Sequence, residues 1–242
     1  MDHTPLTAYH RAWFTHINVA VLESMNGPNY DASHDYEHCI RVVKNAHRLW
    51  LAEKHRPWAR AIDPIVMYTA ALVHDIGDEK YRATNGDGPT VSVQTYAAKR
   101  DRQCNTIRAM LDALNVPPQV AGPAAHIASL VSFTHEMNDD ALPKVEMGKF
   151  PALRIVQDAD RLDVLGLMGI ARAAYHGGVN EARRHGTILT LVRLMDERSV
   201  HHPGRMKTET GRREAEMAWV YMLEFKEGML KQAHCEDVLQ AL

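Results

Sequence analysis

Apolar residues recur at helical spacing along nearly the whole chain, and this periodicity restricts the fold more than any other feature. In the first segment Trp13, Ile17 and Val21 fall on one face, and Asn26-Gly27-Pro28 should end the helix. We find no convincing two-residue alternation that would indicate β-strands, no internal repeat and no low-complexity tract. We therefore predict an all-α fold, a helical bundle.

Capping residues and breakers place the expected helices. Asp63-Pro64 combines an acceptor side chain with proline at the first helical position, and the segment that follows is apolar on most sides, so it should be central and buried. Residues 135–149 should form an acidic, proline-containing loop. Besides the first segment, we expect helices after Ser33, from Pro64 to His74, from Thr90 to about Leu114, over about 124–133, from Pro151 towards Gly177-Gly178, and over about 210–230. The helix after Ser33 should have Asp35 in its first turn, and the last helix should place Ala215, Met222 and Leu223 on its inner face.

Length and composition favour one domain. The 242 residues are 45% apolar and 24% charged, which is enough to build a buried core. We expect a single domain over residues 1–242, in which C-terminal helices from 176–242 pack on a functional core of about 30–175. The net charge of −2 gives no general attraction for nucleic acid polymers or anionic membranes. An anionic substrate would therefore have to be bound locally.

The cysteines and the N-terminal segment indicate the cellular compartment. Cys39, Cys104 and Cys235 form no CxxC pair, which argues against a disulfide framework and fits a reducing compartment. The chain opens without a signal-like pattern, and no run approaches 18 uninterrupted apolar residues. We expect a cytoplasmic protein without membrane association.

The pair His74-Asp75 at the end of an apolar helix is the main chemical signal. Such groups near a core are costly unless they are paired, bound to metal or solvated through a cleft. Both side chains can reach one ion beyond the helix end, and a histidine and a carboxylate from two other helices would complete a set of four ligands. The alternative is a histidinium that complements the helix dipole and pairs with Asp75.

Imidazoles and carboxylates without thiolates suit manganese, iron, cobalt, nickel or zinc, and magnesium less well. The expected cofactor is one divalent metal ion of this group. Such an ion lowers the pKa of water and neutralises charge on a phosphoryl group, so the chemistry it favours is hydrolytic.

Three ordered segments resemble the HD-domain phosphohydrolases: Ser33–Val43, Ala71–Asp78 and Val156–Gly166. Gly169–Arg172 and Thr210–Ala215 fit the branch of this family that includes YedJ-like and YpgQ-like proteins. The resemblance covers most of the chain from about residue 30 to 225. It implies an all-helical, divalent-metal-dependent hydrolase.

The resemblance also implies a ligand set. His38, His74, Asp75 and one residue of Asp158-Ala159-Asp160 would bind the metal, with Asp160 preferred and Asp158 as the alternative. The two aspartates lie about 200° apart on a helix, so only one can face the ion. No histidine lies between Ile76 and Ala125, which favours one metal over two.

Further roles follow from positions near these motifs. Asp78 stands where relatives carry an acid that activates or positions water, so we assign it as general acid or base. Arg41 and Lys80 are expected to bind substrate phosphate oxygens, with Arg161 and Arg172 as further candidates. His126 is expected to face the substrate, and the alternative for it is simple packing.

The sequence thus predicts a metal-dependent phosphohydrolase of a small phosphorylated substrate, most plausibly a nucleotide, cut at a phosphomonoester or a pyrophosphate bond. The alternatives are a di-iron oxygenase on the same scaffold, a specialised enzyme for a substrate without phosphate, and a non-catalytic nucleotide-binding sensor. An apolar face on the last helix would suit a homodimer, although core burial explains the same pattern.

Overall fold

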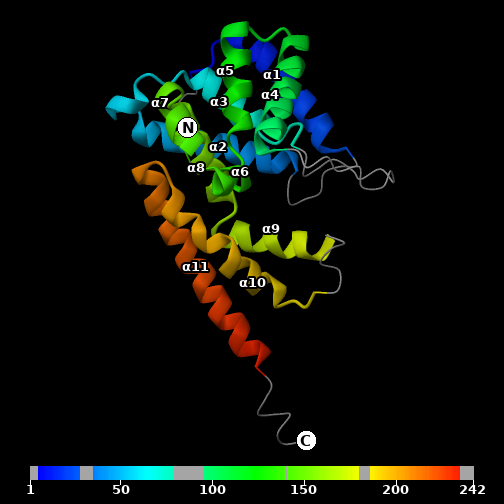
Figure 1. Ribbon diagram of the computed structural model, residues 1–242, viewed down its shortest axis with the longest axis vertical. Helices are drawn as coiled ribbons and strands as arrows, with labels where there is room; N and C mark the ends of the chain where they lie inside the picture. The colour runs from blue at the N-terminus through cyan, green and yellow to red at the C-terminus, as the bar shows by residue number, and fades with distance from the viewer. Residues whose placement is uncertain (1–4, 28–34, 79–94, 140, 180–185, 235–242) are drawn as a thin grey trace, which may run out of the picture. The chain divides into compact units, whose positions relative to one another are not determined.

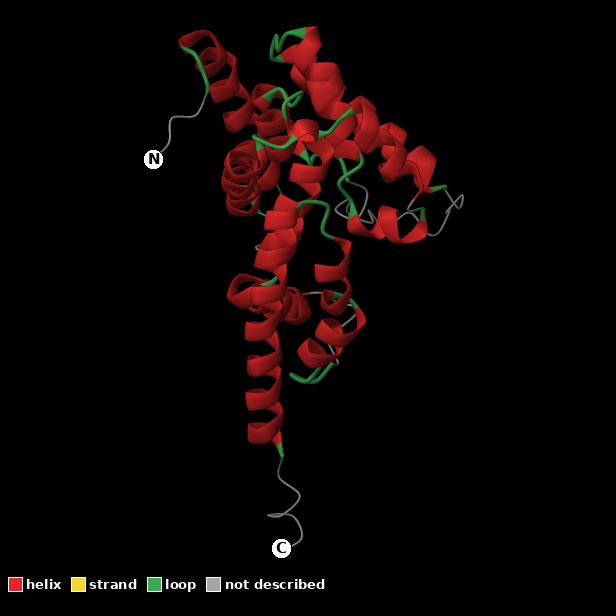
Figure 2. Cartoon of the chain, turned by 90° about the vertical axis from the view of Figure 1, so that its left-hand side faces the viewer, coloured by secondary structure: helices red, strands yellow, loops and turns green. Residues whose placement is uncertain are grey.

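In the computed structural model, residues 5–27, 35–78, 95–139, 141–179 and 186–234 are described. Throughout these residues the regular structure is helical, with no strand (Figure 2), so the predicted all-α class is confirmed. The chain divides into two compact units, Met1–Arg161 and Leu162–Leu242, and the boundary falls inside one helix. That residues 1–242 act as a single domain stays a prediction. In the described part of the chain, no helix is both long and apolar enough to cross a membrane.

The first unit is built around one buried helix. Its elements are α1 (Ala8–Met25), α2 (Tyr36–Glu53), a 3-10 turn (Pro57–Ala59), α3 (Pro64–Val73), α4 (Tyr96–Ala113), α5 (Pro118–Ser129), α6 (Phe133–Asn138), α7 (Ala141–Lys149) and most of α8 (Ala152–Asp163). Helix α3 contacts α1, α2 and α5, and α4 packs on α5 (Figure 1). Every residue from Ile65 to Val73 is buried, so the predicted central position of this helix is confirmed.

Side-chain caps fix where the helices begin. Asp63 accepts a hydrogen bond from the Ile65 backbone at 2.8 Å, with Pro64 at the first helical position as expected. Helix α2 is capped by Asp35, which we had placed in its first turn, and Ser33 lies outside the described residues. Helix α4 is capped by Thr95 rather than by Thr90, which also lies outside them.

The segment from 118 to 149 differs from the prediction. Helix α5 begins at Pro118 and ends at Ser129, so both of its ends come earlier than in the predicted range of 124–133. The early start has a physical reason, because proline is well suited to the first helical position. The predicted loop over 135–149 is wrong, since α6 and α7 occupy most of it. Pro143 sits in the first turn of α7, where the missing amide proton has no helical partner to lose.

The second unit holds the end of α8, then α9 (Gly166–Val179), α10 (Thr190–Glu197), two 3-10 turns (Ser199–His201 and Pro203–Arg205) and α11 (Glu209–Ala233). The helix that we expected to run from Pro151 towards Gly177 is broken at Gly166. This residue has a φ of +64°, a backbone conformation that favours glycine. On α11 the expected inner residues Ala215 and Met222 are buried, whereas Leu223 is 43% exposed.

Gly77, two residues after Asp75, also adopts the left-handed conformation, with a φ of +69°. A Cβ atom there would lie 2.9 Å from Cγ2 of Thr106. We expect Gly77→Ala to lower the free energy of unfolding by at least about 1–2 kcal/mol, the cost of this conformation for an L-residue. Urea unfolding followed by circular dichroism measures the effect.

Gly148→Ala is the matched control for Gly77→Ala. Gly148 lies within α7, is exposed, and has nothing within 4 Å of its would-be Cβ. Alanine there should stabilise the protein by about 0.5–1 kcal/mol. Equal effects of the two substitutions would contradict a conformational role for Gly77.

Candidate metal centre

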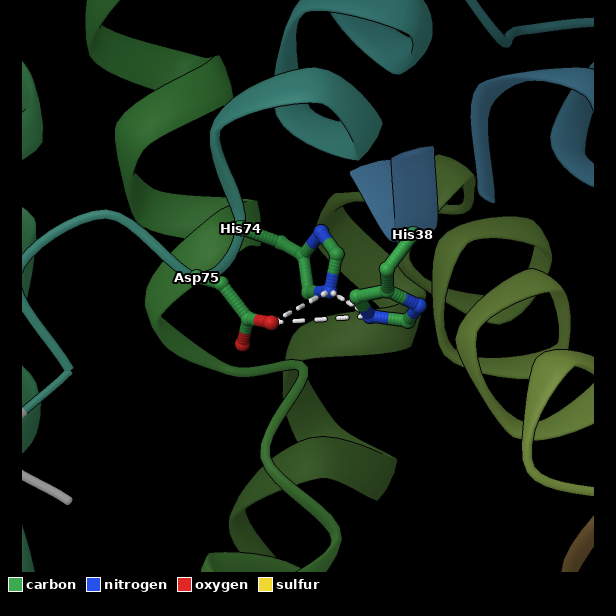
Figure 3. Close-up of side chains that lie close together, drawn as sticks. All are labelled: His38, His74 and Asp75. Carbon is green, nitrogen blue, oxygen red and sulfur yellow. Dashed lines mark hydrogen bonds and ion pairs between the residues drawn. The ribbon is translucent and has the colours of Figure 1, made fainter. Parts of the chain in front are cut away.

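The cap of α2 determines the position of His38. The Asp35 Oδ1 atom accepts a hydrogen bond from the His38 backbone nitrogen at 2.8 Å, which fixes the first turn of the helix. His38 therefore leaves the helix in this first turn, on its buried face, and is only 1% exposed. Its imidazole points towards the end of α3 (Figure 3).

The end of α3 carries the two adjacent candidate ligands. His74 is the C-cap residue, and its Nδ1 lies 2.9 Å from the carbonyl oxygen of Ala71. Asp75 follows in the turn that Gly77 permits, and both side chains are buried. The helix end thus directs an imidazole and a carboxylate to one place.

Three of the predicted ligands meet with their donor atoms in contact range (Figure 3). The Nε2 atoms of His38 and His74 are 3.2 Å apart. Oδ2 of Asp75 lies 3.5 Å from Nε2 of His38 and 3.6 Å from Nε2 of His74. The structure therefore brings together His38 of α2 and His74 at the end of α3, two residues that are 36 positions apart in the sequence.

Asp160 approaches the same two imidazoles from α8. Its Oδ1 atom is 3.3 Å from Nε2 of His38 and 3.5 Å from Nε2 of His74, and its side chain is 19% exposed. Asp158, on the same helix, is completely buried. Of the two aspartates that the sequence left open, Asp160 is the one placed beside the histidines.

The buried donor atoms of His38, His74 and Asp75 could hold a divalent cation, and Asp160 lies beside both imidazoles as the candidate fourth ligand. The Nδ1 atom of His74 faces a carbonyl, so in the neutral ring it carries the proton and Nε2 presents a lone pair to the cluster. Ligands about 2.1 Å from an ion, at right-angled to tetrahedral positions, are separated by about 3.0–3.4 Å. The observed separations of 3.2–3.6 Å come close to that spacing. Two carboxylates with two neutral imidazoles also supply the charge that balances a dication.

The carboxylates shift the pKa of the imidazole beside them. Burial lowers the pKa of His74, but the charges of Asp75 and Asp160, with a hydrogen bond to Asp160, outweigh it and raise the pKa to about 9. Burial alone would raise the pKa of Asp160, because it disfavours the charged carboxylate. The hydrogen bonds and charges of His38 and His74 outweigh burial and hold this pKa well below its usual value. Without metal, a proton on His74 supplies the positive charge that this cluster requires.

We therefore expect metal binding to release about one proton between pH 6.5 and 9. A metal ligand must be a neutral imidazole, so the ion displaces the proton that His74 holds up to about pH 9. The apparent metal affinity should rise by up to about tenfold per pH unit in this window. Titration calorimetry in two buffers of different ionisation enthalpy counts the released protons.

The stability of the metal-free protein should change in the opposite direction. The raised pKa of His74 stabilises the folded, metal-free protein. This stabilisation is complete below pH 6.5, the ordinary pKa of histidine, and is lost as the pH rises through about 9. A metal affinity that is flat between pH 6.5 and 9 would argue against His74 as a ligand.

Four further residues were predicted to belong to the site: Asp78, Arg41, His126 and Lys80. Asp78 is half-buried, and its backbone nitrogen lies 3.4 Å from the carbonyl oxygen of Asp75. Arg41 is three residues after His38 on α2, with its guanidinium 3.8 Å from Glu37. Nε2 of His126 lies 2.8 Å from the Glu146 carboxylate. Lys80 lies outside the described residues, and the roles of all four stay predictions.

Gln103, which the sequence reasoning missed, supports the cluster. Its amide nitrogen donates to the carbonyl oxygen of His74 at 2.8 Å and so ties α4 to the end of α3. Gln103 is buried on the face of α4 that also buries Ile107 and Leu111. A polar residue in such an apolar stripe is the signal that could have identified it.

Arg161, the residue after Asp160, forms a buried ion pair. Arg161 is fully buried, its Nη2 donates to Oε2 of Glu136 on α6, and its guanidinium lies over the Phe133 ring at 5.6 Å. We had considered Arg161 for phosphate binding, but the structure uses it to join α6 to α8. Arg172, considered for the same role, donates to Asp163 at 2.8 Å within the second unit.

Residues 35–165 match the HD domain family, and the chain belongs to this family. Among its relatives is YpgQ of Bacillus subtilis, an uncharacterized protein that is 29% identical over 194 residues, 80% of this chain and 82% of that protein. The crystal structure of YpgQ in complex with ADP matches with a TM-score of 0.61 at 23% identity, over 92% of this chain and 96% of that one. An HD-superfamily hydrolase from Bacillus thuringiensis matches with a TM-score of 0.56 at 24% identity, over 93% and 96%. The resemblance inferred from the sequence is thereby confirmed.

Proposed function

We propose that this protein is a metal-dependent phosphohydrolase of a small phosphorylated substrate. The observation that carries the proposal is the convergence of His38, His74 and Asp75 on one buried place, with Asp160 of a third segment beside both imidazoles. Membership of the HD domain family supports it, and so does the likeness to an HD-superfamily hydrolase.

The protein's contribution is a rigid ligand set. When bound, a divalent ion supplies Lewis-acid chemistry, in that it acidifies water and neutralises phosphoryl charge. The Ala71 carbonyl orients the His74 ring, and the backbone of His74 is held by Gln103. His38, His74, Asp75 and Asp160 would hold the ion and would leave it accessible to water and a substrate oxygen. Manganese, iron, cobalt, nickel and zinc are the ions that suit these donors.

Three residues near the cluster are proposed to act on the substrate. Asp78 would transfer the proton of the attacking water, because it lies one turn beyond Asp75 and is not fully buried. Arg41 would bind phosphate oxygens, since it is only three residues from His38 and its side chain is 24% exposed. Lys80 is proposed for the same task from its position in the sequence.

We further propose that the substrate is a nucleotide. YpgQ, whose structure was determined with ADP, is similar over most of both chains, and this supports a nucleotide as the ligand class. Whether the bond cut is a phosphomonoester or a phosphoanhydride is left to experiment. His126 in substrate binding, a homodimer and a cytoplasmic location remain predictions.

The deciding experiment is a chromatographic assay of the purified protein with Mn²⁺ or Co²⁺ against nucleoside mono-, di- and triphosphates, beside Asp75→Ala. We expect metal-dependent release of phosphate or pyrophosphate by the wild type and none by the variant. The released product identifies the bond that is cut. If no phosphorylated compound is turned over while metal is bound stoichiometrically, the proposal is wrong, and an oxygenase, a sensor or a specialised enzyme takes its place.

A further inference from the structure

The backbone between His74 and Asp75 is held by Gln103 of α4. The Nε2 atom of Gln103 donates to the carbonyl oxygen of His74 at 2.8 Å, and the residue is only 3% exposed. This carbonyl belongs to the planar peptide that joins His74 to Asp75, so a bond to it restricts the directions of both residues. The two side chains leave this peptide towards His38 (Figure 3). One amide group therefore acts on two candidate ligands at once.

The His74 carbonyl needs such a partner because it lies where α3 ends. Carbonyl groups at the end of a helix have no donor from the helix itself. In the turn that follows, backbone amides donate to the carbonyl oxygens of Val73 and Asp75, at 3.0 and 3.4 Å. Gln103 serves the carbonyl of His74, which lies between these two. A buried carbonyl that loses its donor is costly, so this bond helps to fix the turn.

A second residue of α4 lies against the same turn. Thr106 comes three residues after Gln103 and therefore faces the same side of the helix. A Cβ atom added to Gly77 would lie 2.9 Å from Cγ2 of Thr106, so α4 and the turn are in close contact. Gln103 donates from a fixed position, because α4 is anchored by the buried Ile107 and Leu111.

We propose that Gln103 is the positioning residue of the metal centre, through which α4 sets the affinity and the coordination geometry of the bound ion. The inference rests on the proposed metal-dependent function and deepens it. Residues that hold a metal ligand from behind contribute to affinity, because they fix the orientation of that ligand. Gln103 binds the backbone of the ligand rather than its ring, and so orients an imidazole and a carboxylate together.

The first test removes the amide donor and keeps the length of the side chain. Gln103→Met should bind Mn²⁺ and Co²⁺ about 10- to 100-fold more weakly than the wild type, as measured by equilibrium dialysis. The visible absorption spectrum of bound Co²⁺ should also change, since it depends on the positions of the ligands around the ion. Gln103→Leu, which extends the apolar face of Ile107 and Leu111, is a second variant with the same expected result.

Gln157→Met is the matched control. Gln157 is also buried, and its Nε2 atom donates at 2.7 Å to the carbonyl oxygen of Leu130, which ends α5 and is no candidate ligand. Both methionine variants lose one buried hydrogen bond, so urea unfolding should show a similar loss of stability in each. Only Gln103→Met should lose metal affinity and change the Co²⁺ spectrum.

The outcomes separate this inference from the proposed function. If Gln103→Met and Gln103→Leu bind both ions as the wild type does, the positioning role is wrong and the metal centre stands. The role is also overturned if Gln157→Met loses the same affinity, because the effect is then one of general stability. A wild type that binds neither ion contradicts the proposed function, and the positioning role with it.

Discussion

The His74→Ala variant is expected to bind Mn²⁺ or Co²⁺ at least about 100-fold more weakly than the wild type and to lose metal-dependent activity. Loss of a residue behind a metal ligand already costs about 10–100-fold in affinity, and loss of the ligand itself should cost more. Equilibrium dialysis with metal analysis measures the affinity.

The fold should survive this substitution. Alanine keeps the backbone carbonyl to which Gln103 donates, and α3 stays anchored by its nine buried residues. Circular dichroism should therefore show unchanged helical content. His16→Ala, the same change at an exposed histidine of α1, is the control and should retain full metal binding. Full metal occupancy in His74→Ala would rule out the proposed centre.

The sequence indicated the centre well because its signals are local. His74-Asp75 ends a helix that is apolar on every side, and Asp35 caps the helix whose first turn carries His38. Both facts depend on residues only a few positions apart, and helical periodicity reports such facts directly. Helix geometry indicated only that one of Asp158 and Asp160 could face the ion, and the preference for Asp160 came from the resemblance to the family.

The supporting residues could not be predicted in the same way. The Glu136–Arg161 pair joins residues 25 positions apart, and Gln103 meets His74 across 29 positions. Their partners depend on how α4, α6 and α8 pack, which periodicity within one helix does not specify.

The errors in secondary structure have a physical cause as well. Acidic residues and Pro143 suggested a loop over 135–149, but proline is tolerated in a first helical turn, and Glu146 is bonded to both His126 and Lys149. Tertiary partners therefore stabilise α7 where the composition argued against a helix. At Gly166 the apolar pattern continues from α8 into α9, and only the backbone angle shows the break.

The second large effect is expected for Glu136→Ala, which should lower the free energy of unfolding by about 3–5 kcal/mol. The side chain of Arg161 is 0% exposed and that of Glu136 is 5% exposed, so the substitution removes a carboxylate from a guanidinium that water does not reach. Removing one partner of a buried ion pair is strongly destabilising. Urea unfolding gives the free energy.

Asp112→Ala is the control for this loss of a carboxylate. Asp112 pairs with Arg108 at 2.8 Å on the surface of α4, where both side chains are at least 39% exposed, so its removal should cost less than about 1 kcal/mol. The double variant Glu136→Leu with Arg161→Met removes both charges and should recover most of the stability, because the penalty comes from the charge that remains. A loss below about 1 kcal/mol in Glu136→Ala, equal to the surface control, would mean that Arg161 does not depend on Glu136. The link between α6 and α8 beside Asp160 would then have to depend on other contacts of these helices.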